Sequence, residues 1–206
     1  VRISETRKGY QMEFRDVSLE LLTSPMRITL KRDGHKLVES VTDRAFLGNL
    51  RWLPFAKSKD AWLVSIGLHS GSPVYGLGEK FGSLNRKGHL IDSWNEDATT
   101  LNSELSYKNI PFAWSPEGWG LFTHTTSRVI HAVGYPQWSH RSYILKVHDQ
   151  DLDLFFIAAD TPAEILKKYT NLTGRTQELP RWSYGVWMSR AYYKTETETL
   201  EVAQKL

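Results

Sequence analysis

The chain has 206 residues with an ordinary globular composition, 40% hydrophobic and 24% charged, which suits one sizeable domain or one domain with part of another. It contains no cysteine, which excludes disulfides and thiolate metal sites. The net charge is only +3, no apolar run reaches the length of a bilayer span, and the first residues lack signal-peptide features, so we expect a cytoplasmic protein without a nucleic-acid or membrane partner.

Residues 1–160 are predicted to be built from strands. Met26, Ile28 and Leu30 alternate with polar residues, and Asp33-Gly34 predicts a hairpin that resumes through Leu37, because both central positions of a two-residue turn favour positive φ. The densest basic group, at residues 31–36, falls at this turn, which indicates a solvated hairpin. Many more short strands follow, without a convincing helix before about residue 158. The pattern predicts an antiparallel β-sandwich of two sheets over residues 1–160.

The pattern changes at Thr161. Thr161 with Glu164 forms a capping box, Pro162 suits the first helical position, and Gly174 suits the C-terminal stop. One face of this predicted helix carries Ile165, Leu166 and Tyr169. A proline-punctuated, extended linker follows. We therefore expect a linking helix and linker over residues 161–180.

Residues 181–206 are predicted to begin a second domain. Val186, Trp187 and Met188 form a short apolar run typical of a buried strand, and the capping box of Thr195 and Glu198 opens an amphipathic helix. A strand followed by a crossover helix requires a parallel neighbour, whereas the preceding residues show only sandwich strands. This strand–helix unit is therefore expected to be poorly covered, which favours disorder, self-association as a homo-oligomer or docking on the sandwich.

The candidate chemistry lies in the segment GLGEKFGSLNRKGHLIDSWNEDATT. Gly76 and Gly78 lack the strand–turn–helix context of a phosphate-binding loop, so we reject that interpretation. Asp92, Glu96 and Asp97 crowd around a tryptophan, and paired carboxylates are typical of glycosidases. Adjacent Glu96 and Asp97 would point to different sides of an extended chain, so turn capping and a solvated acidic loop are the plainer alternative.

Other residue types give little evidence of chemistry. His124 and His131 lie in predicted strands and lack metal-ligand spacing, so no metal and no cofactor is expected. The triplet Asn171-Leu-Thr matters as a glycosylation acceptor only if the protein is secreted. Eight Trp, nine Tyr and eight Phe suit either a β core or stacking against sugar rings.

Several motifs together resemble glycoside hydrolase family 31, most closely its bacterial α-xylosidase and α-glucosidase branch. These are VYGLGEKFGSLNRKG, SWNEDATT, YKNIPF, GWGLFTHTTSRV and LPRWSYGVWMSRAYY, in consistent order from about Ser24 to the last residue. The resemblance implies a mutarotase-like N-terminal β-sandwich followed by a (β/α)8 catalytic barrel. TPAEILKKYTNLTGR resembles the linking helix and WSYGVWMSR the first barrel strand, so residues 181–206 would be the incomplete start of the barrel.

The resemblance also implies a retaining mechanism with two aspartates, both on later barrel strands. We therefore expect no catalytic residue and no hydrolase activity in these 206 residues. Two substrate-binding positions carry over. Asp97 matches a carboxylate on a sandwich loop that reaches the barrel mouth and binds the sugar beyond the scissile bond. Tyr192, or Tyr193 if the register shifts by one, matches an aromatic residue at the end of the first barrel strand.

The implied partners are an α-glucoside or α-xyloside substrate and the barrel of the same polypeptide. Two other functions stay open. A stand-alone carbohydrate-binding sandwich would bind sugar without catalysis. An aldose epimerase would need a histidine and a carboxylate converging inside the sandwich, and the sequence offers no persuasive pair.

Overall fold

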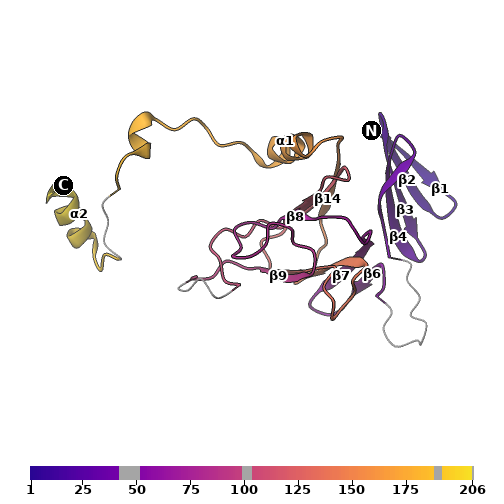
Figure 1. The fold of residues 1–206 in the computed structure, drawn as a ribbon, viewed down its shortest axis with the longest axis horizontal. Coiled ribbons are helices and arrows are strands. Elements are labelled where there is room, and N and C mark those ends of the chain that lie inside the picture. Colours follow the sequence, from indigo (N-terminus) through magenta and orange to yellow (C-terminus); the bar gives the residue numbers. More distant parts are fainter. Residues whose placement is uncertain (42–51, 99–103, 188–191, 206) are drawn as a thin grey trace. The chain divides into compact units, whose positions relative to one another are not determined.

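The computed structural model describes residues 1–41, 52–98, 104–187 and 192–205 (Figure 1). Every described strand precedes Thr161, within the residues 1–160 for which a sandwich is predicted. The strands are β1 (Arg2–Thr6), β2 (Gly9–Phe14), β3 (Val17–Thr23), β4 (Met26–Arg32), β5 (His35–Glu39), β6 (Phe55–Lys57), β7 (Trp62–Gly67), β8 (Tyr75–Gly76), β9 (His89–Ser93), β10 (Phe112–Ser115), β11 (Trp119–Thr123), β12 (Val129–Val133), β13 (Ser142–Val147) and β14 (Leu154–Ala158).

The described strands form three hydrogen-bonded sheets rather than the predicted two. Their strand orders are β1-β2-β3-β4-β5, β6-β7-β13-β12-β9 and β14-β11-β10-β8, and neighbouring strands within each are antiparallel. The predicted hairpin is confirmed, with φ of 46° at Asp33 and 78° at Gly34 between β4 and β5. Beyond β5, within the described residues, an isolated bridge joins Ser40 to Ile66 of the next sheet, and no strand pairing between the two sheets extends it.

A common apolar core joins the three sheets into a sandwich. Inward-facing residues of all three pack together: Ile28, Leu30 and Val38 from the first, Val64, Ile66, Tyr143 and Leu145 from the second, and Ala113, Trp119 and Leu121 from the third. Each of these side chains is buried. Removal of this apolar surface from water is the main stabilising term for such a fold.

The predicted linking helix is present as α1 (Pro162–Thr173). The N-cap half of the predicted capping box is formed, because Thr161 Oγ1 accepts the N–H of Glu164 at 3.3 Å. Glu164 Oε2 accepts the N–H of Asp160, one residue before the N-cap, at 3.2 Å. Gly174 follows with φ of 101°, a left-handed conformation that suits glycine at a helix end. The end signals read from the sequence therefore fix both ends of this helix.

One face of α1 packs on the sheet that contains β14, beside which it lies in Figure 1. Ile165 is fully buried against Phe112 and Ile157, and the ring of Tyr169 stacks on that of Phe112 with centroids 3.9 Å apart. Leu166 was predicted for the same face and is 41% exposed, so that assignment is wrong. The helix turns Leu166 about 100° away from Ile165, past the edge of the contact.

The chain divides into two compact units, Val1–Thr173 and Gly174–Leu206. The predicted domain boundaries at residues 160 and 180 stay predictions. In the second unit, a 3₁₀ turn η1 (Arg181–Tyr184) precedes α2 (Glu196–Lys205). The predicted capping box of α2 is formed, with Thr195 Oγ1 accepting the N–H of Glu198 at 3.1 Å. Among the described residues, no helix has both the length and the apolar character needed to cross a bilayer.

The barrel strand predicted over residues 186–188 is not formed in its described part. Val186 and Trp187 lie in no strand, and Met188 lies outside the described residues. The indole N–H of Trp187 instead donates to the carbonyl of Ser183 at 2.9 Å, which keeps the chain close to η1. A single strand without a hydrogen-bonded neighbour is not stable, and no described strand pairs with it. Val186 is 90% exposed, in line with the predicted lack of cover.

Candidate functional site

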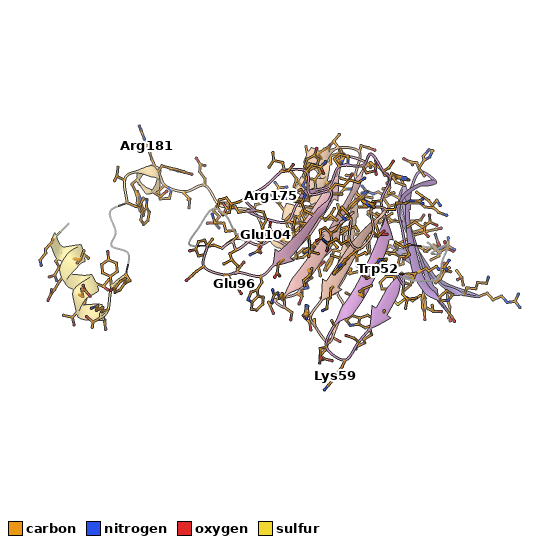
Figure 2. All side chains as sticks on the ribbon, turned by 60° about the horizontal axis from the view of Figure 1, so that its bottom comes forward. Trp52, Lys59, Glu96, Glu104, Arg175 and Arg181 are labelled. Carbon is orange, nitrogen blue, oxygen red and sulfur yellow. The ribbon has the colours of Figure 1, made fainter. Side chains whose placement is uncertain are left out.

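The loop with the sequence WNED follows directly from β9. In β9, Ser93 pairs with Val129 of β12 across the sheet, and this pairing fixes where the strand ends. Beyond it, Asn95 forms a parallel bridge with Ser106, and the N–H of Glu96 donates to the Ser106 carbonyl at 3.2 Å. In the connection from β9 to β10, the residues before its undescribed part therefore contact the residues after it. Glu96 and Glu104, one on each side, lie at the same end of the sandwich in Figure 2.

Asn109 makes most of the hydrogen bonds that hold this connection together. Its side-chain Nδ2 donates to the carbonyl of Trp94 at 2.7 Å, to Oδ1 of Asn95 at 2.9 Å and to the carbonyl of Ser106 at 3.0 Å. Its Oδ1 accepts the hydroxyl of Ser106 at 3.0 Å, and its backbone N–H donates to Asn95 Oδ1 at 3.1 Å. Donor and acceptor sides of one amide are thus both used to hold the loop that leads to Asp97.

A lysine reinforces the base of the same connection. Lys80 Nζ donates to the carbonyl of Asp92 at 2.7 Å and to the carbonyl of Glu104 at 2.8 Å, one on each side of the loop. Burial lowers the pKa of Lys80, because the protein strips water from its ammonium group. The two carbonyls compensate part of that lost hydration.

An arginine inside the glycine-rich segment fixes its course. Arg86 is only 5% exposed, and its guanidinium donates to the carbonyls of Gly76, Ser83 and Gly78 at 3.1, 2.8 and 3.3 Å. Burial lowers its pKa from the ordinary arginine value. The guanidinium thus replaces the sheet hydrogen bonds that this irregular segment lacks.

The two glycines permit close backbone contact rather than phosphate binding. A Cβ on Gly76 would lie 2.3 Å from the carbonyl oxygen of Phe112, and one on Gly78 would lie 2.1 Å from that of Lys108. Both have positive φ, 101° and 79°, a region that other residues rarely adopt.

The three neighbouring carboxylates play different roles. The Nε–H of Arg128 is shared between the two carboxylate oxygens of Asp92, at 3.0 and 2.9 Å. Hydrogen bonding to Asp92, and then the charge of this ion pair, raise the pKa of Arg128. Asp92 therefore has a structural role within β9, where it neither caps a turn nor belongs to a solvated loop. Glu96 and Asp97 are exposed, and neither carboxylate bonds to another described residue. An exposed carboxylate on an anchored loop is free to accept hydrogen bonds from a ligand.

The two predicted substrate-binding residues belong to different units. Asp97 lies in the first unit, and Tyr192, 69% exposed, lies in the second. Tyr193, the alternative, is half-buried. Their convergence on one sugar stays a prediction.

The histidines show no metal chemistry within the described part of the chain. His124 Nδ1 lies 2.8 Å from Asp153 on the surface, and no group of three or more potential ligands occurs among the described residues. His131 is fully buried and bonds through Nδ1 to the hydroxyl of Tyr143 at 2.7 Å. Burial, with a smaller effect of Lys80, lowers the pKa of His131 to about 3. The partner of this buried imidazole is a phenol, whereas the epimerase alternative needs a carboxylate.

Sequence reasoning did not single out Asn109, Lys80 or Arg86. Lys80 and Arg86 bond to backbone carbonyls, and Asn109 bonds to backbone and side-chain groups, that come together only in the fold. The one available signal was their position in or beside the motifs GLGEKFGSLNRKG and YKNIPF.

Residues 1–130 match the family profile described as the glycosyl hydrolase 31 N-terminal galactose mutarotase-like domain. This chain belongs to glycoside hydrolase family 31. Its curated relatives in the family include an α-xylosidase of Emericella nidulans, 37% identical over 136 residues, which cover 66% of this chain and 17% of the relative. Another is the α-xylosidase XylQ of Lactiplantibacillus pentosus, 37% identical over 127 residues, 60% of this chain and 16% of the relative.

Solved structures of family 31 enzymes share the fold. A dextranase of Flavobacterium johnsoniae complexed with glucose has a TM-score of 0.77 and 23% identity, covering 100% of the family 31 chain described here and 24% of the dextranase. An α-xylosidase from a soil metagenome complexed with xylose has a TM-score of 0.71 and 20% identity, and the match covers 99% of this chain and 31% of that α-xylosidase. This family 31 chain therefore spans less than a third of the length of each of these relatives.

Proposed function

We propose that this chain is the N-terminal β-sandwich of a retaining α-glycosidase that hydrolyses α-linked terminal xylosyl or glucosyl residues. The observation that carries the proposal is the match of residues 1–130 to the family's N-terminal domain, together with 37% identity to two α-xylosidases. In this account the enzyme is cytoplasmic, as expected from the sequence.

The sandwich would contribute to the reaction through its anchored loop. Asn109 and Lys80 hold both sides of the connection from β9 to β10. The loop would therefore lose less conformational entropy when it binds a ligand. The exposed Asp97 carboxylate would accept hydrogen bonds from the hydroxyls of the sugar beyond the scissile bond. Tyr192 would supply an apolar face to the sugar that is released.

Bond cleavage would belong to two aspartates of the barrel. One attacks the anomeric carbon, and the other protonates the leaving oxygen and then activates water, so the anomeric configuration is retained. Neither aspartate is assigned to these 206 residues, so the chain alone is proposed to be inactive.

The test is an assay of the polypeptide encoded by the complete reading frame beside the 206-residue chain. Both are supplied with p-nitrophenyl α-xyloside and α-glucoside, and the first product is observed by NMR. We expect the complete protein to release the α-anomer and the 206-residue chain to release none. Release of the β-anomer, or turnover by the chain alone, would contradict the proposal. A stand-alone carbohydrate-binding sandwich is the second candidate, and a reading frame without barrel strands would favour it.

A further inference from the structure

The apolar face of the first sheet extends beyond the sandwich core. On adjacent strands, four apolar residues lie opposite one another in register and therefore share one face: Ile3, Met12, Leu19 and Leu30. Leu30 is 2% exposed, whereas Ile3 is 63% exposed, and the two residues between them are half-buried. Phe14 lies on the same face of β2 as Met12 and is 52% exposed. The cover of this face is therefore lost step by step towards β1.

A cavity of about 240 Å³ lies between this part of the first sheet and β14. Its volume is below the usual range of small-molecule sites, about 300–1,000 Å³. Apart from Glu13, the described residues that line it are apolar: Val1, Met12, Phe14, Val17, Leu19 and Leu30 on one side, and Leu154, Phe155 and Phe156 on the other. Such a lining suits apolar side chains of another polypeptide segment.

The strand on the other side of this cavity has free backbone groups. In the described part of the third sheet, β14 is an edge strand that pairs only with β11. The carbonyl of Asp153 accepts the N–H of His124 from the β11 side at 3.0 Å. Because hydrogen-bonded pairs alternate along antiparallel strands, the backbone groups of Leu154 and Phe156 point away from β11. No described residue bonds to them on that side.

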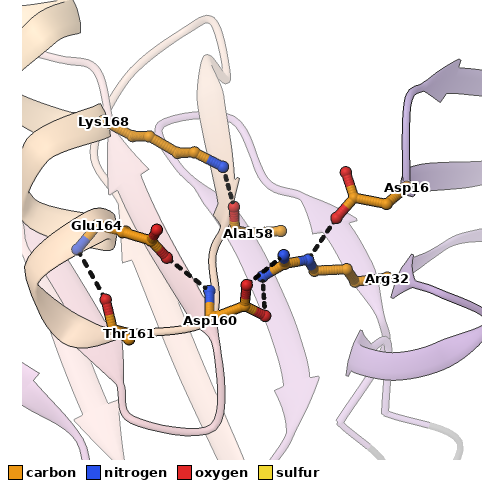
Figure 3. Close-up of polar contacts among 7 residues, drawn as sticks. All are labelled: Asp16, Arg32, Ala158, Asp160, Thr161, Glu164 and Lys168. Atoms are coloured by element: carbon orange, nitrogen blue, oxygen red, sulfur yellow. Dashed lines mark hydrogen bonds and ion pairs between the residues drawn. The ribbon is translucent and has the colours of Figure 1, made fainter.

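One end of this edge is already covered. The carbonyl of Ala158, which points to the same side as that of Phe156, accepts Lys168 Nζ at 2.6 Å (Figure 3). Native proteins usually pair or cover the free edge of a sheet. A further strand beside β14 would continue the third sheet at a spacing of about 4.8 Å, and one row of its side chains would face Met12 and Ile3. The free edge and the uncovered apolar face therefore fit the same missing element.

We propose that a β-strand from the segment that precedes Val1 in the complete polypeptide pairs with β14 and fills this cavity. Val1 itself lines the cavity, so such a segment would start beside it. The chain covers only 17% and 16% of the length of two α-xylosidases, which leaves room for this segment. A covalently linked strand also pairs at high effective concentration. The inference goes beyond the proposed function, because it involves neither substrate nor catalysis.

The experiment is hydrogen–deuterium exchange, followed by mass spectrometry, on three proteins. They are the polypeptide encoded by the complete reading frame, the same polypeptide begun at Val1, and the 206-residue chain. We expect the peptide that contains Leu154 and Phe156 to exchange at least about tenfold more slowly in the complete polypeptide than in the other two. The control is the peptide that contains Lys57, in the edge strand β6 of the second sheet, which should exchange equally in all three.

Two matched variants test the contact with the first sheet. In the complete polypeptide, Ile3→Asp would bury a carboxylate against the added strand and should speed exchange of the β14 peptide at least about tenfold. Ser4→Asp places the same charge on the opposite face of β1 and should leave this exchange unchanged. In the 206-residue chain, where Ile3 is 63% exposed, Ile3→Asp should shift the melting temperature by less than about 2 °C. If the polypeptide begun at Val1 does not fold, these variants decide.

Three results would overturn the proposal: a complete reading frame without residues before Val1, equal protection of β14 in the polypeptide begun at Val1, or equal effects of Ile3→Asp and Ser4→Asp. A 206-residue chain that is dimeric by light scattering and protected at β14 would assign the cavity to a second copy and would also overturn it. Exchange at β14 does not depend on turnover. An inactive polypeptide with a protected β14 would therefore contradict the proposed function alone, and an active one with an exposed β14 would contradict this inference alone.

Discussion

Arg32 of β4 binds Asp160, the residue before the N-cap of α1, across 128 residues of sequence. Its Nη2 donates to Asp160 Oδ2 at 2.6 Å, while its Nε donates to Asp16 Oδ2 at 2.5 Å (Figure 3). Nearby, Lys168 of α1 donates to the Ala158 carbonyl at 2.6 Å. One guanidinium of β4 therefore connects the turn between β2 and β3 of the first sheet to the start of the helix that covers the third sheet.

Arg32→Ala is expected to lower the melting temperature and to speed amide exchange in the first turn of α1, because both carboxylates lose their shared partner. The melting temperature of Arg32→Lys should lie between those of Arg32→Ala and the unmodified chain, since an ammonium cannot bridge two carboxylates with the same fork geometry. The matched control is Lys36→Ala, which removes an exposed pair with Glu39. An effect of Arg32→Ala no larger than that of Lys36→Ala would show that the link is unimportant.

Acid should weaken the same link. The hydrogen bond from Arg32 holds the pKa of Asp16 below its usual 3.8. The contribution of this pair is therefore present above pH 3.8 and is lost as the pH falls through the folded-state pKa of Asp16. Melting curves of Arg32→Ala and the unmodified chain should converge there, and a constant separation would contradict this.

Buried His131 should make stability depend on pH in a different window. Its pKa is about 3 in the folded state against 6.5 for an ordinary histidine, so only the unfolded chain takes up this proton between those values. Stability should fall as the pH drops from 6.5 towards 3, by up to about 1.4 kcal/mol per pH unit from this group. Urea titrations at several pH values measure that slope.

The double variant His131→Leu/Tyr143→Phe removes the imidazole and its phenol partner together and should flatten the slope. His35→Gln, at an exposed position, is the matched control and should keep it. An unchanged slope in the double variant would assign the acid sensitivity to other groups.

Gly78→Ala should destabilise the first unit by about 1–3 kcal/mol from backbone strain alone, because alanine is disfavoured at positive φ. The clash at 2.1 Å with the Lys108 carbonyl adds to that cost. Gly82→Ala is the matched control, since a Cβ there meets nothing within 4 Å. Urea unfolding compares the two. Equal stability of both variants would mean that the loop shifts freely to admit a side chain.

Asn109→Ala should loosen the WNED loop without unfolding the sandwich. The amide of Glu96, which donates to the Ser106 carbonyl, should exchange at least about tenfold faster, while the amides of β11 and β13 keep their protection. Tyr107→Ala, at a 56% exposed position on the same loop, is the control and should change little. Unchanged exchange at Glu96 in Asn109→Ala would show that the backbone bridge alone holds the loop.

Local signals in the sequence predicted the features that depend on a few neighbouring residues. Asp33-Gly34 predicted the hairpin because the turn is set by two residues, and Thr161 with Gly174 predicted both ends of α1. Strands β1 to β3 were not separately identified from the sequence. The signal was nevertheless present in two of them, because apolar residues alternate with polar ones in GYQMEF of β2 and in VSLEL of β3.

The candidate site could be only partly predicted. The loop and its carboxylates are visible as a motif, whereas the contacts of Asn109 and Lys80 join residues up to 24 positions apart through backbone groups. The predicted strand at Val186 failed for a related reason. A strand forms only beside a hydrogen-bonded neighbour, and the described part of this chain offers none there.

The most direct test of the account is the steady-state kinetics of Asp97→Asn in the polypeptide encoded by the complete reading frame, with Glu96→Gln as the matched control. If Asp97 binds the sugar beyond the scissile bond, Asp97→Asn should raise KM about tenfold or more on a disaccharide, where one charged hydrogen bond is lost. It should change kcat less, and Glu96→Gln should behave like the unmodified enzyme. Equal kinetics for Asp97→Asn and Glu96→Gln, or an enzyme without α-glycosidase activity, would contradict the account.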